Sequence, residues 1–182
     1  MKVTDETKHD LHTWLSFLTH FNGHAPFPPV QESRSTDLLF YTDASLTGYG
    51  IVCGPHWVAE KFPPVETFQH SMTWREFYPL LVSVHTFPHL LANRKVCFMT
   101  DNLRVYHILR SLTSLAPDIM SLTRPFVLQC LRHNISFTSS YLPSAENSLA
   151  DPLSRQQFQT FRERAPLADQ QRTPIPDNFK LC

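Results

Sequence analysis

Two aspartates follow apolar runs that are typical of buried strands, and each comes directly after a threonine. Asp43 lies in "FYTDAS" and Asp101 in "FMTDN". If the two strands are parallel neighbours, their ends lie about 4.8 Å apart at the carboxyl edge of the sheet, where open α/β sheets place their sites. Two anions at that distance repel each other unless one is protonated or a cation lies between them. Since no His or Cys lies beside these aspartates, the pair predicts a site for Mg²⁺ rather than zinc.

Two further carboxylates could complete this site. Glu76 lies early in a helix that is predicted to begin near Met72, and Asp151 lies in the final predicted helix, within "ENSLADPLSR". Asn147 precedes Asp151 by four residues and shares its helical face. Four acids from two strands and two helices could hold two metal ions about 4 Å apart, one activating a water and one stabilising a leaving oxygen.

Each acid also has an ordinary structural interpretation. Glu76 stands three residues after Thr73, and this spacing fits a helix capping box about equally well. Asp151 could be a solvated helix residue, while Asp43 and Asp101 could cap the segments that follow them or form turns. The occurrence of all four in this order of strands and helices favours the shared site.

The elements that would position these acids begin after an N-terminal appendage. Apolar residues at helical spacing, from Leu11 to Phe21, predict an amphipathic helix over about residues 6–21. A proline-rich polar linker follows. We expect residues 1–36 to be a helix plus linker, residues 37–156 to form the main domain, and residues 157–182 to be a polar, proline-containing tail.

From Leu38 onward the pattern alternates between strands and helices in the order β-β-β-α-β-α-α-β-α. The first three strands are close together in sequence, which favours an antiparallel meander, whereas strands that are joined through helices pair in parallel. The sequence therefore predicts an α/β domain with a mixed five-stranded sheet, three antiparallel strands and then two parallel ones, flanked by helices.

Composition restricts the possible functions. The chain has 182 residues, of which 42% are hydrophobic, and its 16 basic and 16 acidic residues cancel. A nucleic-acid binder usually has a basic surplus, so any such partner must be held by a local patch or by a neighbouring domain. The four cysteines form no CxxC pair, and neither a signal peptide nor a membrane-spanning run is evident. We expect a soluble intracellular protein, cytoplasmic or nuclear, with reduced thiols.

Four segments together resemble the ribonuclease H domain of retrotransposon reverse transcriptases of the DIRS and gypsy types. They are "YTDASLTGYGIV", "WREFYPLL", "CFMTDN" and "YLPSAENSLADPLSR". The segment "DLHTWLSFLTHFNG" is similar to the region that joins the polymerase to this domain in DIRS-type elements. The resemblance implies an RNase H-like fold and Mg²⁺-dependent hydrolysis of the RNA strand of an RNA–DNA hybrid, within a polyprotein that also carries the polymerase domain.

Residue by residue, the resemblance implies that the catalytic and metal-binding residues are Asp43, Glu76, Asp101 and Asp151. These acids would hold two Mg²⁺ ions, for which Mn²⁺ can substitute. The substrate-binding residues that it implies are Ser45, Asn102 and Asn147.

Two departures from the pattern keep a second interpretation open. Tyr141 stands where related elements often have a histidine before the final helix, and the basic helical protrusion of some RNases H is missing. A catalytically weak or inactive RNase H-like domain that binds nucleic acid or protein is therefore the alternative function. A related nuclease or integrase that acts on DNA is a third interpretation, which the "NSLADPLSR" ending disfavours.

Overall fold

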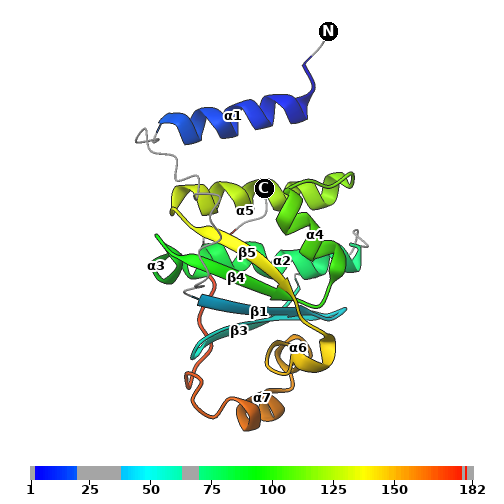
Figure 1. Ribbon diagram of the computed structural model, residues 1–182, viewed down its shortest axis with the longest axis vertical. Coiled ribbons are helices and arrows are strands. Elements are labelled where there is room, and N and C mark those ends of the chain that lie inside the picture. Colours follow the sequence, from blue (N-terminus) through cyan, green and yellow to red (C-terminus); the bar gives the residue numbers. More distant parts are fainter. Residues whose placement is uncertain (1–2, 20–37, 63–69, 178, 180–182) are drawn as a thin grey trace. The chain divides into compact units, whose positions relative to one another are not determined.

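The computed structural model describes residues 3–19, 38–62, 70–177 and 179 (Figure 1). The chain divides into two compact units, Met1–Glu32 and Ser33–Cys182. The first unit contains α1 (Asp5–Thr19), which matches the predicted helix. One side of α1 carries the exposed apolar residues Leu11, Trp14, Leu15 and Leu18. Phe21 and the proline-rich linker lie outside the described residues.

The second unit contains the predicted strands and helices together with three elements that were not predicted, α3, η1 and α7. In chain order they are β1 (Leu38–Ala44), β2 (Gly48–Cys53), β3 (His56–Lys61), α2 (Met72–Thr86), α3 (Pro88–Leu91), β4 (Lys95–Thr100), α4 (Leu103–Ser111), α5 (Pro117–Arg132), β5 (Ser136–Tyr141), the 3₁₀ turn η1 (Ser144–Glu146), α6 (Ala150–Ser154) and α7 (Phe158–Arg164).

The sheet has five strands in the order β3-β2-β1-β4-β5. The pairs β1–β2 and β2–β3 are antiparallel, whereas β1–β4 and β4–β5 are parallel. This confirms the predicted mixed sheet, because short turns joined the antiparallel strands and helical crossovers joined the parallel ones.

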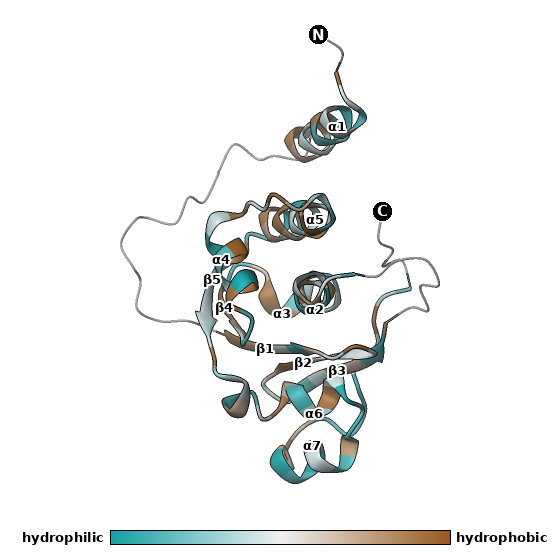
Figure 2. Cartoon of the chain, turned by 90° about the vertical axis from the view of Figure 1, so that its right-hand side faces the viewer, coloured by the Kyte–Doolittle hydropathy of each residue, from teal (hydrophilic) through white to brown (hydrophobic). Residues whose placement is uncertain are grey.

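Helices cover both faces of the sheet (Figures 1 and 2). On one face, α2 and α5 enclose an aromatic core in which Phe40, Phe77, Phe98 and Phe126 are fully buried. On the other face, α6 lies against β1, β2 and β3, and α7 packs against α6 (Figure 2). Two of the predicted catalytic acids, Asp43 and Asp101, lie at the carboxyl ends of β1 and β4, beside this core.

A glycine of β2 allows α6 to approach the sheet closely. A Cβ atom on Gly50 would lie 2.6 Å from both the Ala150 carbonyl oxygen and the Leu153 Cβ, which is closer than real contacts allow. Gly50 pairs with Asp43 of β1 in the antiparallel register. Gly50, the last residue of "YTDASLTGYG", thus allows α6, and Asp151 with it, to lie next to the end of β1.

The segment predicted as a polar tail, residues 157–182, contains α7 and packs against the domain. Its residues belong to the second compact unit, and Phe161 of α7 is fully buried, with its ring centroid 5.2 Å from that of Trp57. The following segment, residues 165–176, which we call the strap, runs along β3. The Asp169 and Thr173 amides donate to the Pro55 and Trp57 carbonyls over 2.9 and 2.8 Å.

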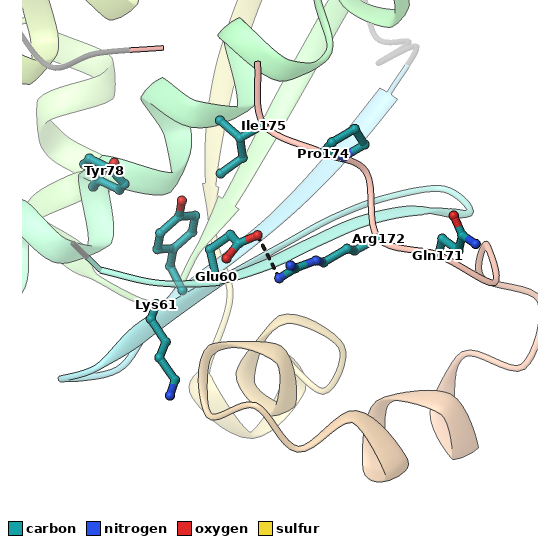
Figure 3. A pocket seen from close by; sticks show the side chains of 8 residues that line it. Glu60, Lys61, Tyr78, Gln171, Arg172, Pro174 and Ile175 are labelled. Carbon is teal, nitrogen blue, oxygen red and sulfur yellow. Dashed lines mark ion pairs between the residues drawn. The ribbon is translucent and has the colours of Figure 1, made fainter. Parts of the chain in front are cut away.

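The packing of this segment against the domain was not foreseen because its average composition is polar. The two phenylalanines of "FQTFRER" are three residues apart, which is the spacing of one helical face. Figure 3 shows how the strap is also held by charge: Arg172 forms an ion pair with Glu60 of β3 over 2.7 Å. Sequence reasoning gave weight to the prolines and overlooked this pair of aromatic residues.

Two absences concern only the described part of the chain. None of its helices is both long and apolar enough to span a membrane. The three cysteines within it, Cys53, Cys97 and Cys130, are buried free thiols, and Cys182 lies outside it.

Candidate metal centre

Three carboxylates meet at the carboxyl ends of β1 and β4. Asp43 lies near the end of β1 and Asp101 directly follows β4, while Glu76 projects from α2. The parallel register places Tyr41 opposite Met99, so the two aspartates, each two residues further on, come level with each other. One carboxylate oxygen from each acid lies within 4.8 Å of the others. We call these three residues the acidic cluster.

The helix that carries Glu76 is not capped by Thr73, the residue that the capping-box interpretation required. Ser71 is the N-cap of α2, and its hydroxyl accepts a hydrogen bond from the Trp74 amide over 3.2 Å. Thr73 is therefore inside the helix, and the capping-box interpretation of Glu76 is wrong. The Glu76 carboxylate faces Asp43 and Asp101. Its Oε2 is buried and has no hydrogen-bond partner.

Asp101 is likewise not the cap of the element that follows it. The Asn102 side chain caps α4 by accepting from the Arg104 and Val105 amides. Asp101 instead accepts a hydrogen bond from the Ser144 hydroxyl over 2.6 Å. Ser144 lies in η1, which follows β5, and sequence reasoning missed it because nothing in "YLPSAEN" distinguishes this serine from a turn residue.

Burial makes the cluster electrostatically unfavourable without a cation. Asp43 is 5% exposed and Glu76 is 6% exposed. Burial raises the pKa of Glu76 to about 9, and the neighbouring charges of Asp43 and Asp101 add to the effect. Burial also raises the pKa of Asp43 to about 6, with further increases from Asp101 and Asp151, while the Ser154 hydroxyl and Arg155 lower it.

These residues fit a divalent cation. The donors are carboxylate oxygens, which Mg²⁺ and Mn²⁺ prefer. The unpartnered Oε2 of Glu76 points to a missing electropositive partner, since buried polar atoms are normally satisfied. Both raised pKa values have the cause that a bound cation would remove, namely uncompensated negative charge in a buried place.

The structure places Asp151 beside the acidic cluster and not within it. Asp151 lies in α6, and its Oδ1 accepts a hydrogen bond from the Arg155 Nε over 2.9 Å. Its charge nevertheless reaches Asp43, whose pKa it raises. Sequence reasoning did not foresee this ion pair, although the one-turn spacing of Asp151 and Arg155 in "ADPLSR" was a visible signal.

The three predicted substrate-binding residues all have structural partners. Ser45 ties the β1–β2 turn to α6 by accepting from the Gly48 amide and donating to the Ser154 carbonyl. Asn102 caps α4. Asn147 is 1% exposed and its amide donates to the Thr42 carbonyl over 2.9 Å, which fixes the backbone beside Asp43. Substrate contact by these residues stays a prediction.

A hollow in the described surface lies apart from the acidic cluster. That hollow, of about 800 Å³, lies between the strap, β2–β3 and α2, and Figure 3 shows the Glu60–Arg172 ion pair in it. Its lining includes none of the four predicted catalytic acids. This hollow is therefore separate from the acidic cluster.

Comparison with known proteins supports the fold. No family model and no curated protein sequence matches the chain. Among solved structures, the chain is similar to the N-terminal RNase H domain of Rv2228c from Mycobacterium tuberculosis, solved as a fusion with maltose-binding protein. The TM-score is 0.54 at 15% identity, covering 65% of this chain and 96% of that one.

A second similar structure is LC11-RNase H1, isolated from compost by a metagenomic approach. Here the TM-score is 0.53 at 12% identity, covering 68% of this chain and 99% of that one. Both neighbours are matched over nearly their whole length. The chain therefore has the RNase H-like fold, with three acids clustered at the carboxyl ends of its two central parallel strands.

Proposed function

We propose that this protein is a ribonuclease H, a divalent-metal-dependent endonuclease that hydrolyses the RNA strand of RNA–DNA hybrids. The observation that carries the proposal is the acidic cluster, in which two of the three acids are buried and one oxygen has no partner, at the carboxyl edge of an RNase H-like sheet.

Asp43, Glu76 and Asp101 would hold one Mg²⁺, with Mn²⁺ as a substitute, and Asp43 with Asp151 would hold a second. When bound, the ions supply an activated water and stabilise the leaving oxygen. The chain itself positions the acids: Ser144 orients Asp101, while Asn147 fixes the backbone of β1. Specificity for the hybrid would come from duplex shape and from 2′-hydroxyl contacts rather than from base edges.

The wider context belongs to the same proposal. The resemblance to retrotransposon reverse transcriptases supports an RNase H domain preceded by a connecting segment, residues 1–36, in a polyprotein that also carries the polymerase. The zero net charge supports it too, because a domain without a basic surplus depends on a neighbour for its grip on the hybrid. Action in the cytoplasm or the nucleus would follow from this role.

The test is a cleavage assay of the full chain with a labelled RNA–DNA hybrid in Mg²⁺ and in Mn²⁺. We expect Asp101→Asn to lower the cleavage rate by roughly a hundredfold or more, because it removes a charged ligand from the cluster. Asp5→Asn, which changes a fully solvated aspartate of α1, is the matched control and should cleave like the parent. Circular dichroism of both variants checks the fold.

The same assay separates the alternatives. Equal cleavage by Asp101→Asn and the parent would overturn the assignment of the cluster. Binding of the hybrid without turnover in either metal would favour the binding-module function instead. A panel of hybrid, double-stranded RNA and double-stranded DNA would identify a DNA-specific nuclease by its preference for the last substrate.

A further inference from the structure

Within the described residues, Asp151 is the one predicted ligand that already has a cationic partner. The Arg155 Nε donates to its Oδ1 over 2.9 Å, and the two residues are one helical turn apart. The arginine and aspartate side chains are 56% and 38% exposed, so the pair adds little to stability. Its position matters more than its strength, since it lies at the edge of the acidic cluster.

The pair lies on α6, which packs against β1. Ala150 of α6 lies against Gly50, the β2 residue that pairs with Asp43. Arg155 is a permanent cation, because a guanidinium stays protonated in proteins. A positive charge therefore already lies against Asp151, the carboxylate that a second divalent ion would have to share with Asp43.

The backbone that carries this pair cannot easily move away. The Ala150 carbonyl and the Leu153 Cβ lie so close to β2 that a Cβ on Gly50 would clash with both. The Ser45 hydroxyl, which donates to the Ser154 carbonyl over 2.9 Å, ties the end of α6 to the β1–β2 turn. Any exchange of partners at Asp151 must therefore take place by side-chain rotation.

We propose that Arg155 competes with the second divalent cation for Asp151, so that the centre binds its two ions with unequal affinity. This inference rests on the metal-binding part of the proposed function. The first ion enters the acidic cluster, where Glu76 Oε2 has no partner to give up. The second ion must displace Arg155 from Asp151, and its affinity is lower by the free energy of that exchange.

The test is calorimetric titration of the full chain with Mn²⁺, in the absence of nucleic acid. We expect Arg155→Ala to bind the second ion roughly tenfold more tightly than the parent, with little change at the first ion. Arg155→Gln keeps a side-chain donor but loses the charge, and it should behave like Arg155→Ala. Arg172→Ala is the matched control, because it breaks an ion pair of similar exposure, with Glu60 on β3.

The outcomes separate this inference from the proposed function. One outcome excludes competition and leaves the metal centre in place. In it the first Mn²⁺ ion binds, and the affinity for the second ion is the same in the parent and in Arg155→Ala, or neither protein binds a second ion. Wild-type behaviour of Arg155→Gln would also exclude it, since the charge would then be irrelevant. Asp43→Asn should bind no Mn²⁺ at the acidic cluster. If the parent binds no Mn²⁺ either, the inference and the proposed function fail together.

Discussion

At the scale of one residue, Glu76 shows how the fold creates a site that a cation would stabilise. Its carboxylate is buried on α2, faces two aspartates and has an oxygen without a partner. The packing of α2 against the sheet holds it there, because Phe77 beside it is fully buried in the core. Metal-free protein must either protonate this group or tolerate its charge, and the raised pKa of about 9 indicates protonation.

A pH-dependent stability follows from this residue. The ordinary pKa of a glutamate, 4.5 here, applies to the unfolded chain, and the folded value is about 9. Between these values the folded protein holds a proton that the unfolded chain releases, so stability is lost as pH rises. From about pH 6.5 to about pH 8.5 we expect the metal-free protein to lose roughly 1–3 kcal/mol of unfolding free energy.

Glu76→Gln provides the matched comparison. The amide has the same shape and no charge, so the variant should lack this decline and be the more stable protein at about pH 8.5. Urea unfolding of both proteins in a chelator measures the difference, and it cancels the titration of groups that the two share. Identical slopes with pH would mean that Glu76 is not protonated in the folded state.

At the scale of elements, the contact between β2 and α6 brings Asp151 to the end of β1. Gly50→Ala should push α6 away, because its new methyl group would lie 2.6 Å from two atoms of that helix. We expect a loss of roughly 2–3 kcal/mol of unfolding free energy from this overpacking. Chemical denaturation of the variant measures the loss.

Gly54→Ala is the control for replacing a glycine of the same hairpin. A Cβ at Gly54 meets nothing within 4 Å, but the residue has a φ of 58°, so only backbone strain is added. That strain costs about 1 kcal/mol. If Gly54→Ala is as damaging as Gly50→Ala, close approach of α6 is not what the glycine at position 50 provides.

Elements were more predictable from the sequence than the contacts between them. The strands and helices from Leu38 to Asn134 follow from local periodicity, and the sheet order follows from short turns and helical crossovers. The convergence of Asp43 with Asp101 was predictable because parallel neighbours end at the same edge. The Asp151–Arg155 and Ser144–Asp101 pairs were not, since side-chain rotamers decide them.

At the scale of the whole domain, the segment after α6 closes the sheet. Strand β3 is an edge strand, and the strap donates hydrogen bonds to the Trp57 carbonyl of β3 and to the Pro55 carbonyl of the preceding turn. The Trp57 indole donates to the Asp169 carbonyl over 2.8 Å, and Arg162 lies over the Trp57 ring at 5.0 Å. The second face of the sheet therefore depends on residues that the sequence analysis had assigned to a tail.

Removal of residues 157–182 should consequently damage the domain. The truncated chain would expose Trp57 and an unpaired sheet edge, which favours edge-to-edge association. We expect an unfolding free energy lower by about 3–5 kcal/mol, as for loss of a buried phenylalanine, and aggregation in size-exclusion chromatography. Phe161→Ala, at a fully buried position, should reproduce most of the loss, whereas Phe158→Ala, at a position that is 40% exposed, should cost clearly less. A truncated chain that is monomeric and as stable as the parent would show that residues 157–182 do not stabilise the domain.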